Sequence, residues 1–287
     1  MALFKIIHIT KYQYNWPIKE SINEIRLFPH NFDNQDVLQH QLLITNSPEI
    51  YISEDCFGNR VGNFNTLETH SEMVIESRML VRVNHSLKIP EIESTTIDDL
   101  TEEKEKSINL LRLCYPEVIE KQNEINAILD KIDFKNKSII EIAQLCNEYV
   151  FSNFTYTKGI TNIETTVDEI LEIRKGVCQD FSHLMISCLR SLGLACRYVS
   201  GYILTSPPPG QARLIGGDAS HAWASVYIPS LDEQGILGLG AWCDLDPTNN
   251  RWGFDSPGED YVHLAHGRDY GDVSPIRGVI HGGADHT

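Results

Sequence analysis

The N-terminal third of the chain alternates apolar and polar residues in short runs. The clearest runs cover residues 4–10, 38–44 and 73–81, and turn residues at 16–17, 47–48 and 57–60 separate them. Side chains of a β-strand point alternately to its two faces, so this period of two predicts strands with one buried face. We therefore expect an antiparallel β-domain over residues 1–90.

The pattern changes to a helical period between residues 101 and 154, where apolar residues recur at intervals of three and four. Ser138 and Glu141 have the spacing of a capping box at the start of one helix, and Thr166 and Glu169 repeat it at the start of another. The positions expected on buried helix faces are Ile108, Leu111 and Tyr115, then Ile125, Ile128 and Leu129, then Ile139, Ile142, Ala143, Cys146, Tyr149 and Val150.

A stretch without a sustained period, residues 86–96, lies between these two patterns. It is rich in polar residues and contains Pro90. Such composition is typical of the exposed connection between two domains. We expect a domain boundary here, with a second domain over residues 91–287.

Size and charge exclude some partners. A chain of 287 residues with 41% hydrophobic content can bury a sizeable core, and a formal net charge of −16 opposes binding to a phosphate backbone. No run approaches the roughly 20 apolar residues that cross a bilayer, and the first ten residues hold no long apolar segment. We expect a cytoplasmic protein with no nucleic-acid or membrane partner.

The seven cysteines are widely scattered, and no two of them form a Cys-x-x-Cys pair. Neither a disulfide framework nor a zinc ribbon is therefore expected. Cys114, Cys146 and Cys188 fall within predicted helices, where a reduced thiol packs as a small apolar side chain. Cys178 differs from these three because it lies between two predicted helices.

Cys178 is expected at the N-terminus of a helix. Gly176 ends one helical pattern, and a new pattern of apolar residues begins at Phe181 and continues to Leu192. Unpaired backbone N–H groups and the positive end of the helix dipole stabilise a thiolate at such a position. Cys178 is therefore the predicted nucleophile.

Two later runs supply an imidazole and a carboxylate. His221 begins an alternating run, and the run over residues 241–246 ends at Asp246. With a turn at residues 232–235, antiparallel pairing would place His221 opposite Asp246. Asp244 lies two residues back on the same face and is the alternative orienting carboxylate.

A cysteine, an imidazole and a carboxylate together predict acyl transfer through a thioester. The Cys178 sulfur would attack an amide carbonyl, His221 would protonate the leaving amine, and Asp246 would hold the imidazole. An oxyanion must also be stabilised, and the backbone N–H of Cys178 is one expected donor.

Other residues near the nucleophile are expected to support the cleft. Gln179 and Tyr156 are candidates for the second oxyanion donor, and residues 206–217 form a loop that could gate the cleft. The remaining candidates for cleft support are Asp180, His183 and Trp223.

In these segments the chain resembles the transglutaminase-like superfamily of papain-related cysteine enzymes, in its bacterial branch with an added N-terminal β-domain. The matching segments are residues 57–59, 176–181, 220–223, 246–249, 267–270 and 275–278. The resemblance implies an α+β fold, in which helices pack on an antiparallel sheet and the cysteine lies at a helix start. It also implies that Cys178, His221 and Asp246 form a catalytic triad.

Three functions are compatible with these residues. The leading hypothesis is a cysteine-dependent hydrolase of amide or peptide bonds, with a peptide or protein as substrate. The same residues would serve a transglutaminase, which passes the acyl group to an amine. A catalytically silent binding module is the rival from another class, and the intact Cys178, His221 and Asp246 argue against it.

No metal ion or other cofactor is expected. A site formed by Cys178, Asp180 and His183 would occupy the sulfur lone pair that catalysis requires. The sequence has no calcium-binding loop of the Asp-x-Asp-x-Asp-Gly type. The C-terminal histidines fit no standard ligand spacing and are expected in a solvated or loosely packed tail: His263, His266, His281 and His286.

Overall fold

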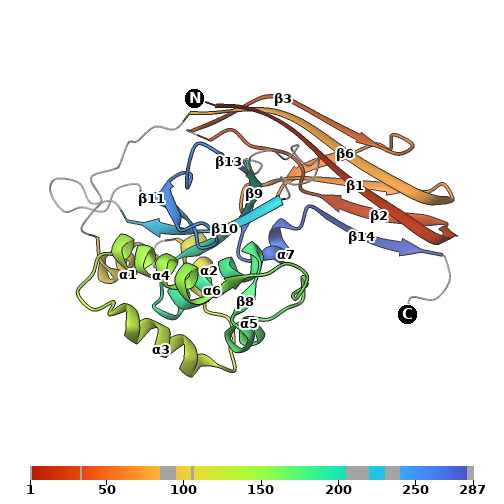
Figure 1. Cartoon of the computed structure of the whole chain (residues 1–287). Helices are drawn as coiled ribbons and strands as arrows, with labels where there is room; N and C mark the ends of the chain where they lie inside the picture. The colour runs from red at the N-terminus through yellow and green to blue at the C-terminus, as the bar shows by residue number, and fades with distance from the viewer. Residues whose placement is uncertain are drawn as a thin grey trace, which may run out of the picture.

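A computed structural model describes residues 2–32, 34–84, 95–104, 107–204, 220–229 and 240–282. The alternating runs of the N-terminal third form long strands (Figure 1). These strands are β1 (Ala2–Ile18), β2 (Glu20–Ile25), β3 (Gln35–Ile44), β4 (Tyr51–Glu54), β5 (Arg60–Thr66) and β6 (His70–Val83).

The strands make a β-sandwich. One sheet has the order β1-β6-β3, and the other has the order β14-β2-β5-β4, in which β14 is Ile276–His281. Neighbouring strands are antiparallel. The period of two is visible along β6, where Met73, Ile75, Met79 and Val81 are buried between the sheets. The expected antiparallel β-domain is therefore confirmed.

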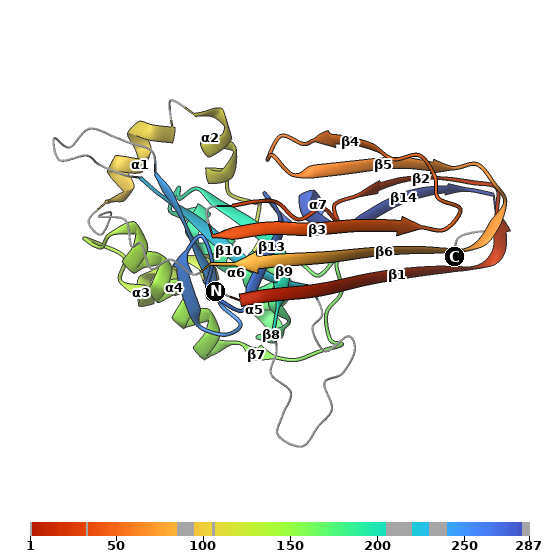
Figure 2. The same cartoon turned by 90° about the horizontal axis from the view of Figure 1, so that it is seen from above.

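One strand of the sandwich comes from the other end of the chain. β14 (Ile276–His281) returns to pair antiparallel with β2 at the edge of the second sheet (Figure 2). The segment that we assigned to the second domain thus completes the N-terminal sandwich. The division at residue 90 stays a prediction, because residues 85–94 lie outside the described ranges.

The rest of the chain forms a five-stranded antiparallel sheet with helices on one face (Figure 1). Its order is β12-β11-β10-β9-β13, and a parallel pair, β7 with β8, lies apart. The strands are β7 (Thr155–Tyr156), β8 (Lys175–Gly176), β9 (Cys196–Ile203), β10 (Ser220–Ile228), β11 (Ala241–Asp246), β12 (Arg251–Phe254) and β13 (Tyr261–Gly267). The helices are α1 (Ile97–Lys104), α2 (Ile108–Cys114), α3 (Gln122–Ile132), α4 (Ile139–Asn153), α5 (Val167–Ile173), α6 (Cys178–Ser191) and α7 (Tyr270–Val273).

The sheet is the middle layer of the molecule. On one face, α4 and α6 contribute to a large apolar cluster with β9, β10 and β11. Toward the β-sandwich, Tyr202 of β9 and Val262 and Leu264 of β13 join the apolar cluster of that sandwich. Mixed helices and antiparallel sheets confirm the α+β class.

Local signals predicted the helix starts well. Both capping boxes are present, at Ser138 with Glu141 and at Thr166 with Glu169. The expected buried face of α2 is wrong, however, because Leu110 and Leu113 are buried while Ile108 is 83% exposed. α2 has only two turns and is apolar on several sides, so its periodicity does not select one face.

Two side-chain amides fasten the sandwich to β13, an edge strand of the middle sheet. The Gln35 amide donates to the carbonyl of His263 and accepts from its N–H, both at 2.9 Å. The Asn59 amide likewise donates to the carbonyl of His266 at 2.6 Å and accepts from its N–H at 2.9 Å. The amides thus satisfy backbone groups that an edge strand leaves unpaired.

This junction corrects one expectation. His263 and His266 lie within β13, and the ring of His263 stacks on Phe32 with centroids 4.4 Å apart. His263 Nε2 and His266 Nδ1 are 3.1 Å apart. The expectation of a solvated or loosely packed tail is therefore wrong for these two, because an interface with Phe32 covers them.

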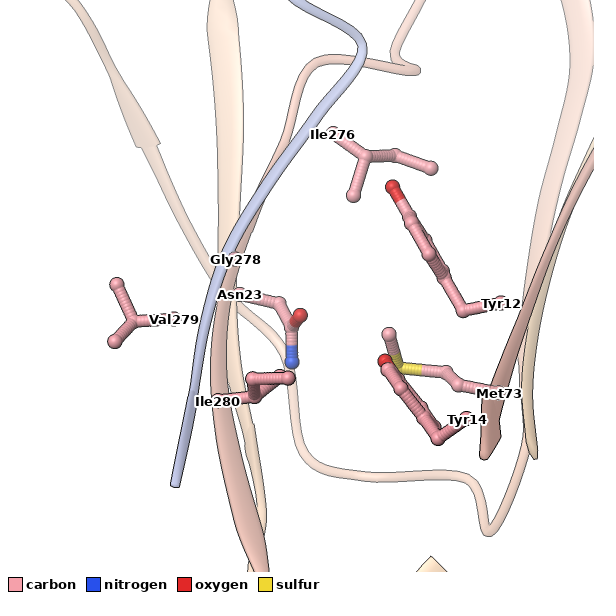
Figure 3. A pocket seen from close by; sticks show the side chains of 8 residues that line it. All are labelled: Tyr12, Tyr14, Asn23, Met73, Ile276, Gly278, Val279 and Ile280. Carbon is pink, nitrogen blue, oxygen red and sulfur yellow. The ribbon is translucent and has the colours of Figure 1, made fainter. Parts of the chain in front are cut away.

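A cleft of about 540 Å³ opens between the two sheets of the sandwich (Figure 3). The rings of Tyr12 and Tyr14 are nearly parallel, at 8°. Tyr12 faces Ile276, Tyr14 lies across the opening from Asn23, and Val279 points away. The lining residues are Tyr12, Tyr14, Asn23, Met73, Ile276, Gly278, Val279 and Ile280. The cleft contains none of the predicted site residues.

Candidate active site

As the sequence predicts, Cys178 is the first residue of α6. Its side chain is half-buried. Gly176 does not end the preceding helix, as we expected from the sequence. The left-handed residue that ends α5 is Arg174, at φ 54°. Gly176 leaves room for a carboxylate, since a Cβ there would lie 2.7 Å from Asp180 Oδ2.

Asp180 braces the start of α6. Its Oδ2 accepts hydrogen bonds from the Val177 N–H and the Thr161 hydroxyl, both at 2.7 Å. Burial raises the pKa of the Asp180 carboxyl, and these hydrogen bonds oppose that rise. The carboxyl thereby ties the loop that contains Thr161 to the turn that presents Cys178.

His221 lies on β10 and Asp246 at the end of β11. The two strands pair antiparallel, as expected, but the predicted register is wrong by two residues. Ala224 pairs with Leu245, and continuing that register places Trp223 opposite Asp246. His221 Nε2 still reaches Asp246 Oδ2 at 2.7 Å, because diagonal neighbours on one face of a sheet are within reach of long side chains.

Asp246 is fully buried and accepts four hydrogen bonds. The donors to Oδ2 are His221 Nε2 at 2.7 Å, Asn249 Nδ2 at 2.6 Å and the Tyr261 hydroxyl at 2.6 Å. The Thr248 N–H donates to Oδ1 at 2.8 Å. A buried carboxylate with this many donors is held in its charged form.

The charges of these groups support one another. Burial lowers the pKa of the His221 imidazole, but hydrogen bonds and charge interactions with Asp246 and Cys178 outweigh it and raise that pKa to about 10. Burial acts to raise the pKa of Asp246, but His221, Asn249 and Tyr261 lower it below its usual value. Since Nε2 of His221 is bound to Asp246, Nδ1 is the ring nitrogen left for Cys178.

The alternative carboxylate, Asp244, accepts a hydrogen bond from Trp223. Its Oδ2 accepts from Trp223 Nε1 at 2.8 Å, and both side chains are buried. Trp223 in turn lies 6.3 Å from the His221 ring, centroid to centroid. Asp244 therefore orients the indole, while Asp246 contacts the imidazole.

The other predicted support residues are distributed around Cys178. Gln179 is half-buried in the first turn of α6. Tyr156 pairs with Gly176, two residues before Cys178, and its ring centroid lies 6.5 Å from that of Phe181 in the first turn of α6. Burial, followed by the charge of Cys178, raises the pKa of the Tyr156 phenol. His183 Nε2 accepts from the Tyr270 N–H at 3.2 Å and thus braces α6 against α7. Residues 206–217 and 232–235 lie outside the described ranges.

Three residues that contact Asp246 were not assigned a role from the sequence. Asn249 and Thr248 could have been found, because an aspartate followed by Pro-Thr-Asn is typical of a turn in which the aspartate accepts from nearby donors. Tyr261 lies 15 residues away, on β13 at the far edge of the sheet, and no local pattern indicates it.

The His221–Asp246 pair should make stability depend on pH. The pKa of His221 is raised from 6.5 to about 10 on folding, so its contribution is fully present below pH 6.5 and is lost as the pH rises through 10. We expect the free energy of unfolding, measured in urea from pH 6 to 10, to fall more steeply for wild type than for His221→Gln. The maximal difference in slope is about 1.4 kcal/mol per pH unit. Parallel curves would contradict the pairing.

Within the described ranges, no group of three or more His, Cys, Asp or Glu side chains is placed to hold a metal ion. The helices of the described part are all too short or too polar to cross a bilayer.

Two family models match the chain. The model described as the transglutaminase-like superfamily matches residues 126–247, and the model described as the bacterial transglutaminase-like N-terminal region matches residues 4–82. The first range contains Cys178, His221 and Asp246. The second covers most of the N-terminal sandwich strands.

Two mycobacterial relatives match the chain over nearly its whole length. An uncharacterized protein of Mycobacterium tuberculosis is 34% identical over 99% of this chain and 89% of its own length. An uncharacterized protein of Mycobacterium leprae is 27% identical over 98% and 94%. The crystal structure of a candidate cysteine protease from Cytophaga hutchinsonii is 20% identical, with a TM-score of 0.73 over 96% of this chain and 85% of that one. That structure has the same fold.

Proposed function

This chain belongs to the transglutaminase-like superfamily, and from that premise we propose that it is a cysteine-dependent hydrolase of amide or peptide bonds. The observation that carries the proposal is the position of His221. Its imidazole interacts with Cys178 on one side and with the buried Asp246 on the other. This is the order of contacts that nucleophilic acyl transfer requires.

The reaction has two halves. The Cys178 thiolate attacks the amide carbonyl, and the C–N bond breaks as the protonated His221 gives its proton to the leaving amine. The acyl group is then a thioester on the sulfur. His221, now neutral, takes a proton from water, the resulting hydroxide attacks the thioester, and the carboxylic acid leaves with return of the thiolate.

Two features support stabilisation of the oxyanion. The backbone N–H of Cys178 lies at the start of α6, where helix N–H groups have no intrahelical partner. Tyr156 lies on β7 beside Gly176, two residues before Cys178, and is 46% exposed, so substrate can reach it. We propose Tyr156 as the second donor.

A transglutaminase is the second candidate, because both family descriptions name transglutaminases. In that reaction an amine replaces water as the acceptor of the acyl group, and Cys178, His221 and Asp246 keep their roles. The substrate is in either reaction a peptide or protein that supplies the amide.

Selective alkylation tests the proposal. We expect iodoacetamide at pH 7 to modify Cys178 about tenfold faster than the more exposed Cys56, because a thiolate is the reactive form. Peptide mapping by mass spectrometry measures both rates in the same sample, so Cys56 is the internal reference. The faster reaction should disappear in Cys178→Ala and slow in His221→Ala. Equal rates at both cysteines would favour a silent binding module.

Hydrolysis and transfer are separated by the acceptor. The test incubates a glutamine peptide with and without a primary amine and measures the product masses by mass spectrometry. A hydrolase yields the glutamate peptide or cleavage fragments in both mixtures, whereas a transglutaminase yields the amine adduct in the mixture that contains the amine.

We also propose a reducing compartment, the cytoplasm, for this protein. All seven cysteines are unpaired, and free thiols persist where disulfides are kept reduced.

A further inference from the structure

The hydroxyl of Tyr261 reaches the same oxygen that holds the imidazole. It donates to Asp246 Oδ2 at 2.6 Å, and His221 Nε2 lies 2.7 Å from that oxygen. Tyr261 is the first residue of β13 and is 2% exposed. Its ring packs edge-on against Trp223, at 5.5 Å and 85°, so the hydroxyl is held in a fixed direction.

We propose that Tyr261 is a positioning residue of this site, which sets how much negative charge Asp246 presents to His221. This inference rests on the proposed function. A hydrogen bond to a carboxylate oxygen withdraws charge from it, and His221 and Tyr261 share one oxygen. The imidazolium must be stable enough to form yet must still release its proton to the leaving amine.

Charged and polar side chains surround the contact between Tyr261 and Asp246. Cys178 of α6 and Asp246 of β11 face His221, and Asn249 also donates to Asp246. Arg251 lies 5.9 Å from the centre of the Tyr261 ring and is paired with Asp260, at 2.6 Å. The Arg251 charge is thus largely balanced by Asp260, and Tyr261 and Asn249 are neutral side-chain donors to Asp246.

Removing the Tyr261 hydroxyl should shift the pH dependence of kcat. In Tyr261→Phe, Asp246 is a stronger acceptor for His221, so the imidazolium holds its proton more tightly. We expect the alkaline limb of the kcat profile to move up by about 0.5–1 pH unit. We expect kcat at pH 7.5 to fall about 5- to 20-fold with KM within about twofold, since binding is untouched.

A direct titration makes the test independent of turnover. The ¹³Cε1 resonance of His221, assigned by its absence from His221→Gln, should titrate higher in Tyr261→Phe than in wild type. Tyr202→Phe is the matched control. Tyr202 is also buried, on neighbouring β9, but its hydroxyl lies 2.9 Å from His8 Nδ1, so neither kcat nor the His221 titration should move.

A second variant covers a failure of Tyr261→Phe to fold. Introducing 3-fluorotyrosine at position 261 makes the phenol a stronger donor and should lower the His221 titration. The inference is overturned if neither substitution moves that titration, or if Tyr202→Phe moves it equally. Failure of the proposed function looks different, because Cys178 of wild type would then react no faster than Cys56.

Discussion

Replacing Asp246 by asparagine should lower kcat/KM for the peptide substrate by roughly a thousandfold to ten-thousandfold. Both carboxylate oxygens accept hydrogen bonds, from Thr248 on Oδ1 and from three donors on Oδ2. An asparagine amide must therefore place its NH₂ against a donor in either orientation. The negative charge that stabilises the His221 imidazolium is lost as well. The fold should persist, because asparagine has the same shape.

Asp244→Asn is the matched control and separates the two carboxylates that the sequence leaves open. It removes a buried carboxylate from the same strand, two residues away, but its partner is Trp223. We expect kcat/KM to stay within about tenfold of wild type, since the triad contacts remain. Initial rates and circular dichroism of both variants measure this. A larger loss in Asp244→Asn than in Asp246→Asn would reverse our assignment.

The features that the sequence predicts correctly depend on neighbours within a few residues. Ser138 and Glu141 satisfy each other across one turn, so their spacing alone indicates the start of α4. The position of Cys178 is also predicted locally, because the sequence on either side of it indicates where α5 ends and where α6 begins. The alternation along β6 likewise reports a face that one sheet buries against another.

The features that it does not predict depend on contacts between distant segments. Strand register follows from the packing of both strands and from their connection, and a shift by two residues keeps every side chain on its face. The pattern therefore selected the correct face for His221 and Asp246 but not the pairing. Tyr261 reaches the site from an edge strand, so only the folded sheet reveals it.

Arg190 is another residue whose role emerges only from the folded chain. Its side chain is fully buried on α6, and its guanidinium donates to three backbone carbonyls and pairs with Glu117. The carbonyls belong to Leu113 at 2.9 Å, Cys196 at 2.7 Å and Arg268 at 2.8 Å. One side chain thus joins α2, β9 and the end of β13 to the helix that carries Cys178.

We expect Arg190→Met to lower the free energy of unfolding by about 3–5 kcal/mol, measured in urea. Methionine keeps the aliphatic part but leaves three buried carbonyls without this donor and Glu117 without its buried partner. Arg78→Met is the matched control: Arg78 is 49% exposed and paired with Glu76, so we expect a loss below about 1 kcal/mol. Burying a guanidinium is itself unfavourable, and burial indeed lowers the pKa of Arg190. An equal loss of unfolding free energy in both variants would contradict this prediction. The cost of burying the Arg190 guanidinium would then cancel its four contacts, and packing of the helices against the sheet would hold α6 in place.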